Sequence, residues 1–259
     1  MARLYQALVS LGVMLGVSLA ALPISVAAEL EEIRARGHLV VAVKDNWRPL
    51  GFRNDAGELV GFEIDIARQL AQVLVGDAAA ITLAPVANQE RLPVVMEGRV
   101  DLAIAGVAAT PARMRLVSFS MPYYLDGTAV VAQDPQIRAL QDVGPGPLTV
   151  LAGSDAIATL QYLLPHTVLN SVTSYQAALS RLQAGQTRGV AADLTVLTGW
   201  VQEHPDYHLL PNTLSSVPLA VVMPKGVQYN DLRRQVNNSI HQWHQDGWLE
   251  ERATAWGLP

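Results

Sequence analysis

The sequence predicts an α/β protein made of two lobes, and three observations carry this prediction. Short apolar runs alternate with segments whose apolar residues recur at helical spacing. The alternation occurs in two series, which meet near the linker-like cluster Gly144-Pro145-Gly146-Pro147. Of the 259 residues, 50% are hydrophobic and 16% are charged, which is enough apolar side chain for a sizeable core. Strands that alternate with helices indicate α/β layers with a largely parallel sheet.

Residues 1–28 have the pattern of a secretory signal peptide. Arg3 supplies a positive charge, and the apolar run at 8–22 is shorter than the ~20 residues that a membrane helix needs. Val26, Ala27 and Ala28 bring small residues to the end of the segment, so we expect cleavage after Ala28. An uncleaved N-terminal anchor is the alternative. No later segment holds ~18 consecutive apolar residues, and the chain has no cysteine. Together these features predict an exported protein of the periplasm.

The first series of elements follows the signal peptide directly. A helix is expected at 29–36 because Gly37 gives a C-terminal cap signal, and a second at 62–74 because its apolar residues recur at helical spacing. The segment 91–98 is expected to form a third helix. The expected strands of this series are 38–43, 81–86 and 101–105.

The second series begins near Pro147 and ends by returning to the first. The expected strands are 148–152, 167–169, 189–192 and 219–223, and the last of these leads back toward the first series. The expected helices are 154–164, 175–184, one that begins at Leu194, 230–246, and a short final helix that ends at 256–257. We therefore expect a first lobe at 29–131 and 222–259 and a second lobe at 132–221. Two crossings, near 131–132 and 219–221, would act as the hinge.

Composition and motifs exclude several classes of function. The net charge of −5 and the lack of a Lys or Arg run argue against a nucleic-acid binder. Without cysteine, the chain has no disulfide, thiolate metal site or cysteine nucleophile. The motifs of serine hydrolases, zinc proteases and phosphate-binding loops are also missing from the sequence, so no cofactor is expected. His241 and His244 are three residues apart, but no third ligand accompanies them, so no metal site is expected.

Six segments give the chain a resemblance to a known family. They occur in order from about residue 30 to residue 257. The segments are Gly37-His38-Leu39-Val40-Val41-Ala42-Val43, Asp55-Ala56-Gly57-Glu58-Leu59-Val60-Gly61-Phe62-Glu63-Ile64-Asp65-Ile66-Ala67, Gly98-Arg99-Val100-Asp101-Leu102, Thr110-Pro111-Ala112-Arg113, Phe119-Ser120-Met121-Pro122-Tyr123-Tyr124 and Trp256-Gly257. With them, the chain resembles the periplasmic solute-binding proteins of ABC transporters, specifically the polar amino-acid-binding family, bacterial extracellular solute-binding protein family 3.

The resemblance implies a periplasmic-binding-protein-like type II fold, in which a two-strand hinge joins two α/β lobes. It also implies a receptor and not an enzyme. Such a receptor closes its lobes over a free L-amino acid and delivers it to the permease subunits of an ABC transporter in the inner membrane. We expect a monomer that has no nucleic-acid partner.

A free amino acid is a zwitterion, and an unpaired buried charge is expensive, so the site must offer a partner to each end of the ligand. A guanidinium can bind a carboxylate through two parallel hydrogen bonds. The resemblance implies that Arg113 binds the α-carboxylate together with the backbone N–H at Ala108, and that a carbonyl near Gly106 accepts from the ammonium. The family usually has Ser or Thr where this chain has Ala108. The chain therefore keeps the amide and loses a hydroxyl contact worth ~0.5–1.5 kcal/mol.

The second lobe is expected to supply the remaining contacts. The resemblance implies that Asp193 neutralises the ammonium; its alternative role is to cap the helix that begins at Leu194. Ser154 and the amide of Asp155 open a helix, where free N–H groups favour anions such as the ligand carboxylate. Asp155 departs from the family pattern, and its own carboxylate could compete for the same amides.

Three residues of the first lobe bear on the ligand side chain. Trp47 occupies a place where the family often has an aromatic residue that covers this side chain, although a partly buried hinge aromatic is the alternative. Lys44 stands where binders of basic amino acids tend to carry an acid, so it would repel lysine or arginine. Asn88 lies at a position that is often apolar or aromatic in the family. These residues favour an acidic or a neutral polar amino acid.

Two other functions remain open at this point. Cyclohexadienyl dehydratases resemble the same family and need an acid placed over the ligand ring, a role that Asp155 or Glu90 could fill. A ligand-binding sensor domain is the second alternative.

Overall fold

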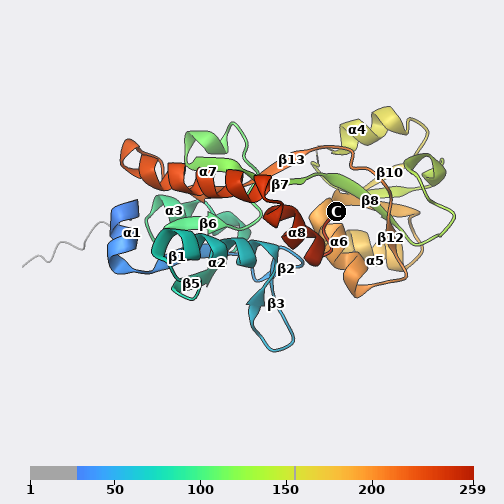
Figure 1. Cartoon of the computed structure of the whole chain (residues 1–259). Coiled ribbons are helices and arrows are strands. Elements are labelled where there is room, and N and C mark those ends of the chain that lie inside the picture. Colours follow the sequence, from blue (N-terminus) through green and yellow to red (C-terminus); the bar gives the residue numbers. More distant parts are fainter. Residues whose placement is uncertain (1–27, 155) are drawn as a thin grey trace, which may run out of the picture.

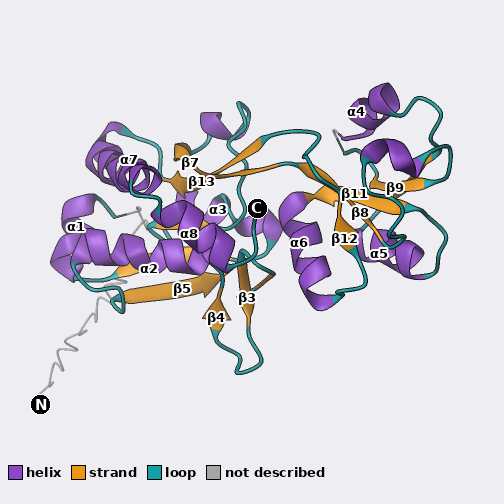
Figure 2. Cartoon of the chain, turned by 45° about the vertical axis from the view of Figure 1, so that its right-hand side comes forward, coloured by secondary structure: helices purple, strands orange, loops and turns teal. Residues whose placement is uncertain are grey.

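The computed structural model describes residues 28–154 and 156–259, and within them it has two five-stranded sheets, each covered by helices. Figures 1 and 2 show the two sheets in separate halves of an elongated molecule, with β7 and β13 running between the halves. The fold class predicted from the sequence, α/β, is confirmed. The predicted signal peptide lies outside the described residues, apart from Ala28.

The first sheet has the strand order β5-β1-β6-β13-β7. These strands are β5 (Ile81–Pro85), β1 (Leu39–Val43), β6 (Leu102–Ile104), β13 (Val217–Met223) and β7 (Ser118–Asp126). β1 runs parallel to both β5 and β6, whereas β13 runs antiparallel to β6 and β7. In each parallel pair, the carboxyl ends lie at one edge of the sheet, and the loops that follow β1 and β6 start there.

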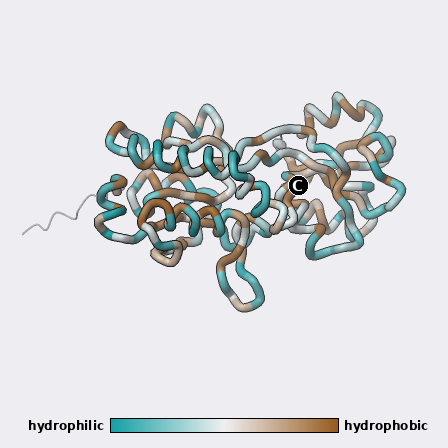
Figure 3. The backbone as a smooth tube through the Cα atoms, viewed as in Figure 1, coloured by the Kyte–Doolittle hydropathy of each residue, from teal (hydrophilic) through white to brown (hydrophobic). Residues whose placement is uncertain are grey.

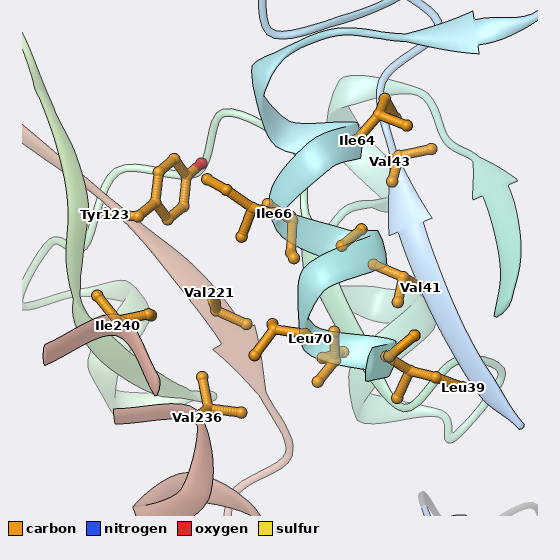
Figure 4. Packing of buried hydrophobic residues seen from close by; sticks show 14 of the residues in the cluster. Leu39, Val41, Val43, Ile64, Ile66, Leu70, Tyr123, Val221, Val236 and Ile240 are labelled. Carbon is orange, nitrogen blue, oxygen red and sulfur yellow. The ribbon is translucent and has the colours of Figure 1, made fainter. Parts of the chain in front are cut away.

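On one face of this sheet lie α1 (Leu30–Arg36), α2 (Phe62–Val75), α7 (Asn230–Gln245) and α8 (Trp248–Ala255). α2 and α7 bury apolar side chains against the sheet, as the helical spacing of those side chains predicts. Figure 4 shows the apolar side chains of α2 between those of β1, on one side, and those of β13, β7 and α7, on the other. We refer to the first sheet with these helices as the first lobe.

Short elements connect the longer ones in the first lobe. A three-stranded sheet, β2 (Asn46–Trp47), β3 (Gly51–Arg53) and β4 (Leu59–Val60), follows β1 and projects from the body (Figure 1). The helix predicted at 91–98 is wrong in extent: η1 (Asn88–Glu90) precedes a helix of four residues, α3 (Pro93–Met96). Pro93 stands at the start of α3, where proline is favoured because the first N–H groups of a helix have no partner within the helix.

The second sheet has the strand order β10-β9-β11-β8-β12. These strands are β10 (Leu169–Val172), β9 (Leu148–Leu151), β11 (Gly189–Asp193), β8 (Thr128–Ala132) and β12 (His208–Leu209). Its helices are α4 (Ala156–Leu163), α5 (Tyr175–Gln183) and α6 (Leu194–Glu203), with η3 (Leu140–Val143) between β8 and β9. The strand predicted at 167–169 begins two residues later, as β10, and its register with β9 is set from Leu169 to Val172. We refer to this sheet with its helices as the second lobe.

The chain crosses between the sheets at slightly different positions from those that the sequence suggests. β7 ends at Asp126 in the first sheet, and β8 begins at Thr128 in the second, where it pairs with β11. The return crossing precedes Val217, because β13 pairs with β7 from that residue onward. The crossings expected near 131–132 and 219–221 therefore lie inside β8 and β13. Both are apolar runs, and such a run does not mark the point at which the chain changes sheets.

The two crossings contact each other closely. The Thr128 N–H donates to Ser215 Oγ at 2.9 Å, and a Cβ on Gly127 would lie 2.0 Å from the Ser215 carbonyl oxygen.

Figure 3 shows apolar chain concentrated inside each half and mostly polar chain in the outer loops. Across the part of the chain that the structure describes, no helix combines the length and apolar character needed to cross a membrane.

Candidate functional site

A cavity of about 740 Å³ lies between the lobes. It is lined by loops that follow β1 and β6 in the first lobe, and by α5, α6 and the end of β11 in the second. Seven of the nine residues proposed from the sequence line it: Lys44, Trp47, Asn88, Gly106, Ala108, Arg113 and Asp193. The volume falls within the ~300–1,000 Å³ usual for small-molecule sites. The structure therefore brings most of the predicted site together.

Ala108 and Arg113 form one half of the site. The Ala109 N–H donates to the Pro218 carbonyl, and the Val107 carbonyl accepts from the Ala220 N–H. Because a trans peptide directs its N–H and C=O in opposite directions, the N–H and C=O of Ala108 point away from β13. The Ala108 carbonyl accepts from Arg113 Nη1 at 3.0 Å. A backbone N–H and a guanidinium thus lie side by side, as a carboxylate requires.

Gly106 is held by groups on both sides of its backbone. Its N–H donates to Glu63 Oε1 at 2.7 Å, and its carbonyl accepts from Arg91 Nη1 at 2.9 Å. The family resemblance implies that a carbonyl near Gly106 accepts from the ligand ammonium, and the carbonyl of Gly106 itself is already bonded to a cation. It retains one lone pair at most, and the adjacent guanidinium disfavours a second cation there.

Arg91 has a structural role that the sequence did not reveal. Its guanidinium also donates to the carbonyls of Asn88 and Ala105, so it ties the loop after β5 to the loop after β6. Burial lowers the pKa of Arg91, and the nearby charge of Arg113 lowers it further. Two guanidinium groups thus contribute positive charge to the same wall of the cavity.

Glu63 lies behind this loop and is fully buried. Its Oε1 accepts from the Tyr123 hydroxyl as well as from Gly106, and its Oε2 has no hydrogen-bond partner among the described residues. Burial raises the pKa of Glu63 to about 7, although both hydrogen bonds act in the opposite direction. Glu63 belongs to one of the segments shared with the family. Its contact with Gly106 spans 43 positions, so only the fold reveals its role.

Lys44, Trp47 and Asn88 lie at the cavity as predicted. Lys44 is buried and donates from Nζ to the Val86 carbonyl at 2.9 Å; burial lowers its pKa, with a further contribution from Arg91. The Trp47 ring lies against Gly106, where a Cβ would come within 2.6 Å of Cζ3. The Asn88 side chain is exposed at the cavity, while its backbone carbonyl accepts from Arg91.

Asp193 comes from the second lobe, at the junction of β11 and α6. Its Oδ2 accepts from the Tyr175 hydroxyl at 2.8 Å, and both residues line the cavity. The alternative role, a cap for the helix that follows, is contradicted, because Asp193 occupies the N-cap position but makes no side-chain cap bond.

The cap is supplied instead by Asp126, which the sequence analysis did not single out. Its Oδ1 accepts from the backbone N–H of Thr195 at 3.2 Å and from that of Gly127 at 2.8 Å, and its Oδ2 accepts from Thr195 Oγ1 at 2.8 Å. Burial raises the pKa of Asp126 to about 6, and the nearby charge of Asp193 adds to this. The contacts with Thr195 join residues 69 positions apart, so no local pattern could have indicated them.

Ser154 is not among the residues that line the cavity. Its Oγ accepts from the Ala156 N–H at 3.2 Å, so the hydroxyl serves the start of α4. Asp155, the other predicted contact of this helix, lies outside the described residues. Within residues 28–154 and 156–259, no group of three or more His, Cys, Asp or Glu residues is placed to hold a metal ion.

The lobes also contact each other, in part through residues that line the cavity. Arg48 forms an ion pair with Glu203 of α6, with 3.3 Å between Nε and Oε1. A Cβ on Gly199 of α6 would lie 2.2 Å from the Arg48 carbonyl oxygen. Gln202 donates from Nε2 to the Trp256 carbonyl at 2.6 Å. Figures 1 and 2 both show α6 next to α8 and the C-terminus.

Comparisons with known proteins agree with this architecture. Residues 39–259 match the family model described as bacterial extracellular solute-binding proteins, family 3. The glutamine-binding protein of Geobacillus stearothermophilus is 32% identical over 196 residues, which cover 74% of each chain. The ABC transporter glutamine-binding protein GlnH of Bacillus subtilis is 26% identical over 230 residues, which cover 88% of this chain and 84% of that protein.

Solved structures share the fold. Two structures of an ancestral protein, AncCDT-1, superpose with TM-scores of 0.72 and 0.65, and each match covers 88% of this chain and 98% of the other. The sequence identities are 24% and 23%. AncCDT-1 is described in one case as an ancestral cationic amino-acid solute-binding protein and in the other as a precursor of cyclohexadienyl dehydratase. The type II periplasmic-binding-protein fold predicted for this chain is confirmed by these matches.

Proposed function

The chain belongs to family 3 of the bacterial extracellular solute-binding proteins, and from this premise we propose that it captures a polar amino acid, acidic or neutral, between its two lobes. It acts in the periplasm as a receptor and not as an enzyme, and it delivers the ligand to the permease subunits of an ABC transporter. Ligand binding draws the lobes together, because only the closed form brings both half-sites to one molecule.

One observation carries the proposal: opposite charges from different lobes line one cavity. Arg113 and the outward N–H of Ala108 suit an α-carboxylate, and Asp193 of the second lobe suits an α-ammonium. When the lobes close, Arg113 and Asp193 lose water, and a bound zwitterion replaces that water by pairing with both charges.

The charges around the cavity support an acidic or neutral side chain. Arg48 and Glu203 are paired with each other, whereas the side chains of Lys44, Arg91 and Arg113 of the first lobe donate to backbone carbonyls of the described residues. A basic ligand side chain near these cations would be repelled, while a carboxylate or carboxamide would gain favourable contacts.

A thermal-shift screen of the mature protein against the twenty amino acids tests the proposal. A ligand that binds only the folded state raises the melting temperature by mass action, and we expect the largest rise from an acidic or neutral polar amino acid. Arg113→Ala should weaken calorimetric affinity for that ligand roughly 30-fold or more, because it leaves a buried carboxylate unpaired. Arg115→Ala, at an exposed arginine nearby, is the matched control. Equal affinities for the two variants would contradict the assignment of Arg113.

The role of Lys44 in selectivity is tested by replacing its charge. Lys44→Asp should shift preference from acidic toward basic amino acids, because the new charge reverses the field at the ligand side chain. Since Lys44 is buried, Lys44→Gln provides a milder second variant and should only reduce the preference for acidic ligands. The same selectivity in wild type and both variants, measured by calorimetry, would remove Lys44 from the site.

A dehydratase on the same scaffold remains the alternative function, since AncCDT-1 is described as a precursor of cyclohexadienyl dehydratase. Of the two candidate acids, Glu90 lies off the cavity wall and accepts from the Ala87 N–H at 3.4 Å, and Asp155 lies outside the described residues. Incubation with prephenate or arogenate separates the two functions: turnover would establish the enzyme, and we expect none.

A further inference from the structure

The start of α6 is capped by the segment that joins the lobes and not by its own N-cap residue. The Leu194 N–H donates to the Gly127 carbonyl at 2.7 Å, and the Thr195 N–H donates to Asp126 Oδ1. Asp126 is the last residue of β7, and Gly127 lies between β7 and β8. Two of the N–H groups that a helix leaves unpaired at its start are therefore satisfied from the crossing.

Asp193 stands at the N-cap position, where an aspartate side chain ordinarily accepts from the second or third N–H of the helix. Thr195 is the second residue of α6, so its N–H is the group that Asp193 would take. Because Asp126 already holds that N–H and the Thr195 hydroxyl, this cap bond is not available to Asp193. Its carboxylate instead lies at the cavity with Tyr175.

We propose that Asp126 is a positioning residue for ligand binding: by capping α6 in place of Asp193, it keeps the Asp193 carboxylate directed into the cavity. Only the expected effect on ligand affinity rests on the proposed function. The geometric part concerns where one carboxylate lies and can be tested without a ligand.

The geometric part predicts that replacing Asp193 and replacing Asp142, which caps a helix elsewhere in the chain, change the melting temperature differently. Asp193→Ala should leave the melting temperature unchanged within about 1 °C, because Asp126 still caps α6. Asp142→Ala is the matched control, since Asp142 caps η3 by accepting from the N–H groups of Arg138 and Ala139, far from the cavity. Loss of that cap should lower the melting temperature by about 2–4 °C. An equal loss in Asp193→Ala would mean that Asp193 is the cap, and would overturn the proposal.

A crystal structure of ligand-free Asp126→Ala tests the same point directly. We expect the Asp193 carboxylate to turn to the Thr195 N–H and to lose its bond to Tyr175. If Asp193 still accepts from Tyr175 in this variant, Asp126 does not determine its position.

The consequence for binding is tested by calorimetry with L-glutamate and L-glutamine as probes. Asp126→Ala should weaken binding about tenfold in the wild-type background and less than twofold in an Asp193→Ala background, because its effect passes through Asp193. Asp126→Asn keeps an acceptor for the Thr195 N–H without the charge, and should stay within threefold of wild type. Equal effects in both backgrounds, or an Asp126→Asn variant as weak as Asp126→Ala, would contradict the proposal. If the wild-type protein binds neither probe, the proposed choice of ligand fails, while the melting and crystallographic results still decide the role of Asp126.

Discussion

At the scale of single residues, the first lobe contains a carboxyl group whose charge its surroundings oppose. Glu63 has no exposed surface, and one of its oxygens has no hydrogen-bond partner in the part of the chain that the structure describes. The Tyr123 hydroxyl that donates to Glu63 stays protonated, because burial raises the pKa of Tyr123 well above its usual value. Figure 4 shows this hydroxyl pointing from β7 toward α2, the helix that carries Glu63. The protonated form of Glu63 is therefore favoured more in the folded chain than in the unfolded one.

The first prediction concerns stability against pH. The pKa of Glu63 rises from 4.5 to about 7 on folding, so its stabilising contribution is complete below pH 4.5 and is lost as pH rises through 7. Glu63→Gln is neutral at every pH and should keep that contribution. The free energy of unfolding of the variant should therefore match wild type near pH 4.5 and exceed it above pH 7, by up to roughly 3 kcal/mol.

Urea unfolding at several pH values measures this difference, and Glu250→Gln, on the exposed side of α8, is the control. A difference between Glu63→Gln and wild type that does not change with pH would show that Glu63 keeps its charge in the folded protein.

At the scale of elements, the loop after β6 depends on a glycine. Gly106 has φ +62°, and a Cβ there would lie 2.6 Å from the Trp47 ring. Gly185 has nearly the same φ, +65°, but open space around it. The two positions share the backbone strain that a side chain would meet and differ in the contact with Trp47.

Replacing both glycines separates these effects. Gly185→Ala should lose about 1–2 kcal/mol of stability from the left-handed backbone alone. Gly106→Ala should lose a further ~1–3 kcal/mol, because the indole must shift, and it should also weaken amino-acid binding. Chemical denaturation and calorimetry measure the two losses. Equal destabilisation of the two variants would mean that Trp47 moves freely and does not define this wall of the cavity.

The sequence predicts some elements better than others, for physical reasons. β1 and α2 were predicted from long apolar patterns that depend on their own residues. β7 was not predicted, because its exposed and buried residues do not alternate regularly and Pro122 interrupts it. The strands β2 to β4 have two or three residues each, too few to show a period. They form because β3 pairs antiparallel with both β2 and β4, and no pattern within any one of these strands indicates that pairing.

At the scale of the whole molecule, α6 of the second lobe rests against the first. Gly199 allows its close approach to the Arg48 carbonyl, and the ion pair of Arg48 with Glu203 lies beside that contact. An alanine inside a helix ordinarily adds up to ~1 kcal/mol of stability relative to glycine. At Gly199 its methyl group would instead separate the lobes.

We therefore predict that Gly199→Ala keeps or raises the stability of the second lobe and weakens amino-acid binding. Small-angle X-ray scattering should report a larger radius of gyration for the liganded variant than for liganded wild type. Ser180→Ala, at an exposed position of α5, is the control. Wild-type affinity together with an unchanged scattering curve would indicate that closure does not need this contact.

The residues of the cavity could be predicted only in part, because several of them depend on how the whole chain folds. Arg113 lies in a segment that is recognisable in the sequence, and Asp193 ends an apolar run that predicts a strand. Asp126, Tyr175 and Arg91 gain their roles from groups that the fold brings to them from other elements. Ser154 was predicted from its place at a helix start, yet its hydroxyl is used by that same helix.

The paired strands that link the halves have a mechanical consequence. β7 and β13 remain hydrogen-bonded from Ser118 to Asp126, with register shifts beside Ala220, so the link is a ribbon and not two independent tethers. Because the two strands are hydrogen-bonded to each other, they bend together, and the two halves turn about one shared link. Each cycle of capture and release can then return the same groups to the same alignment.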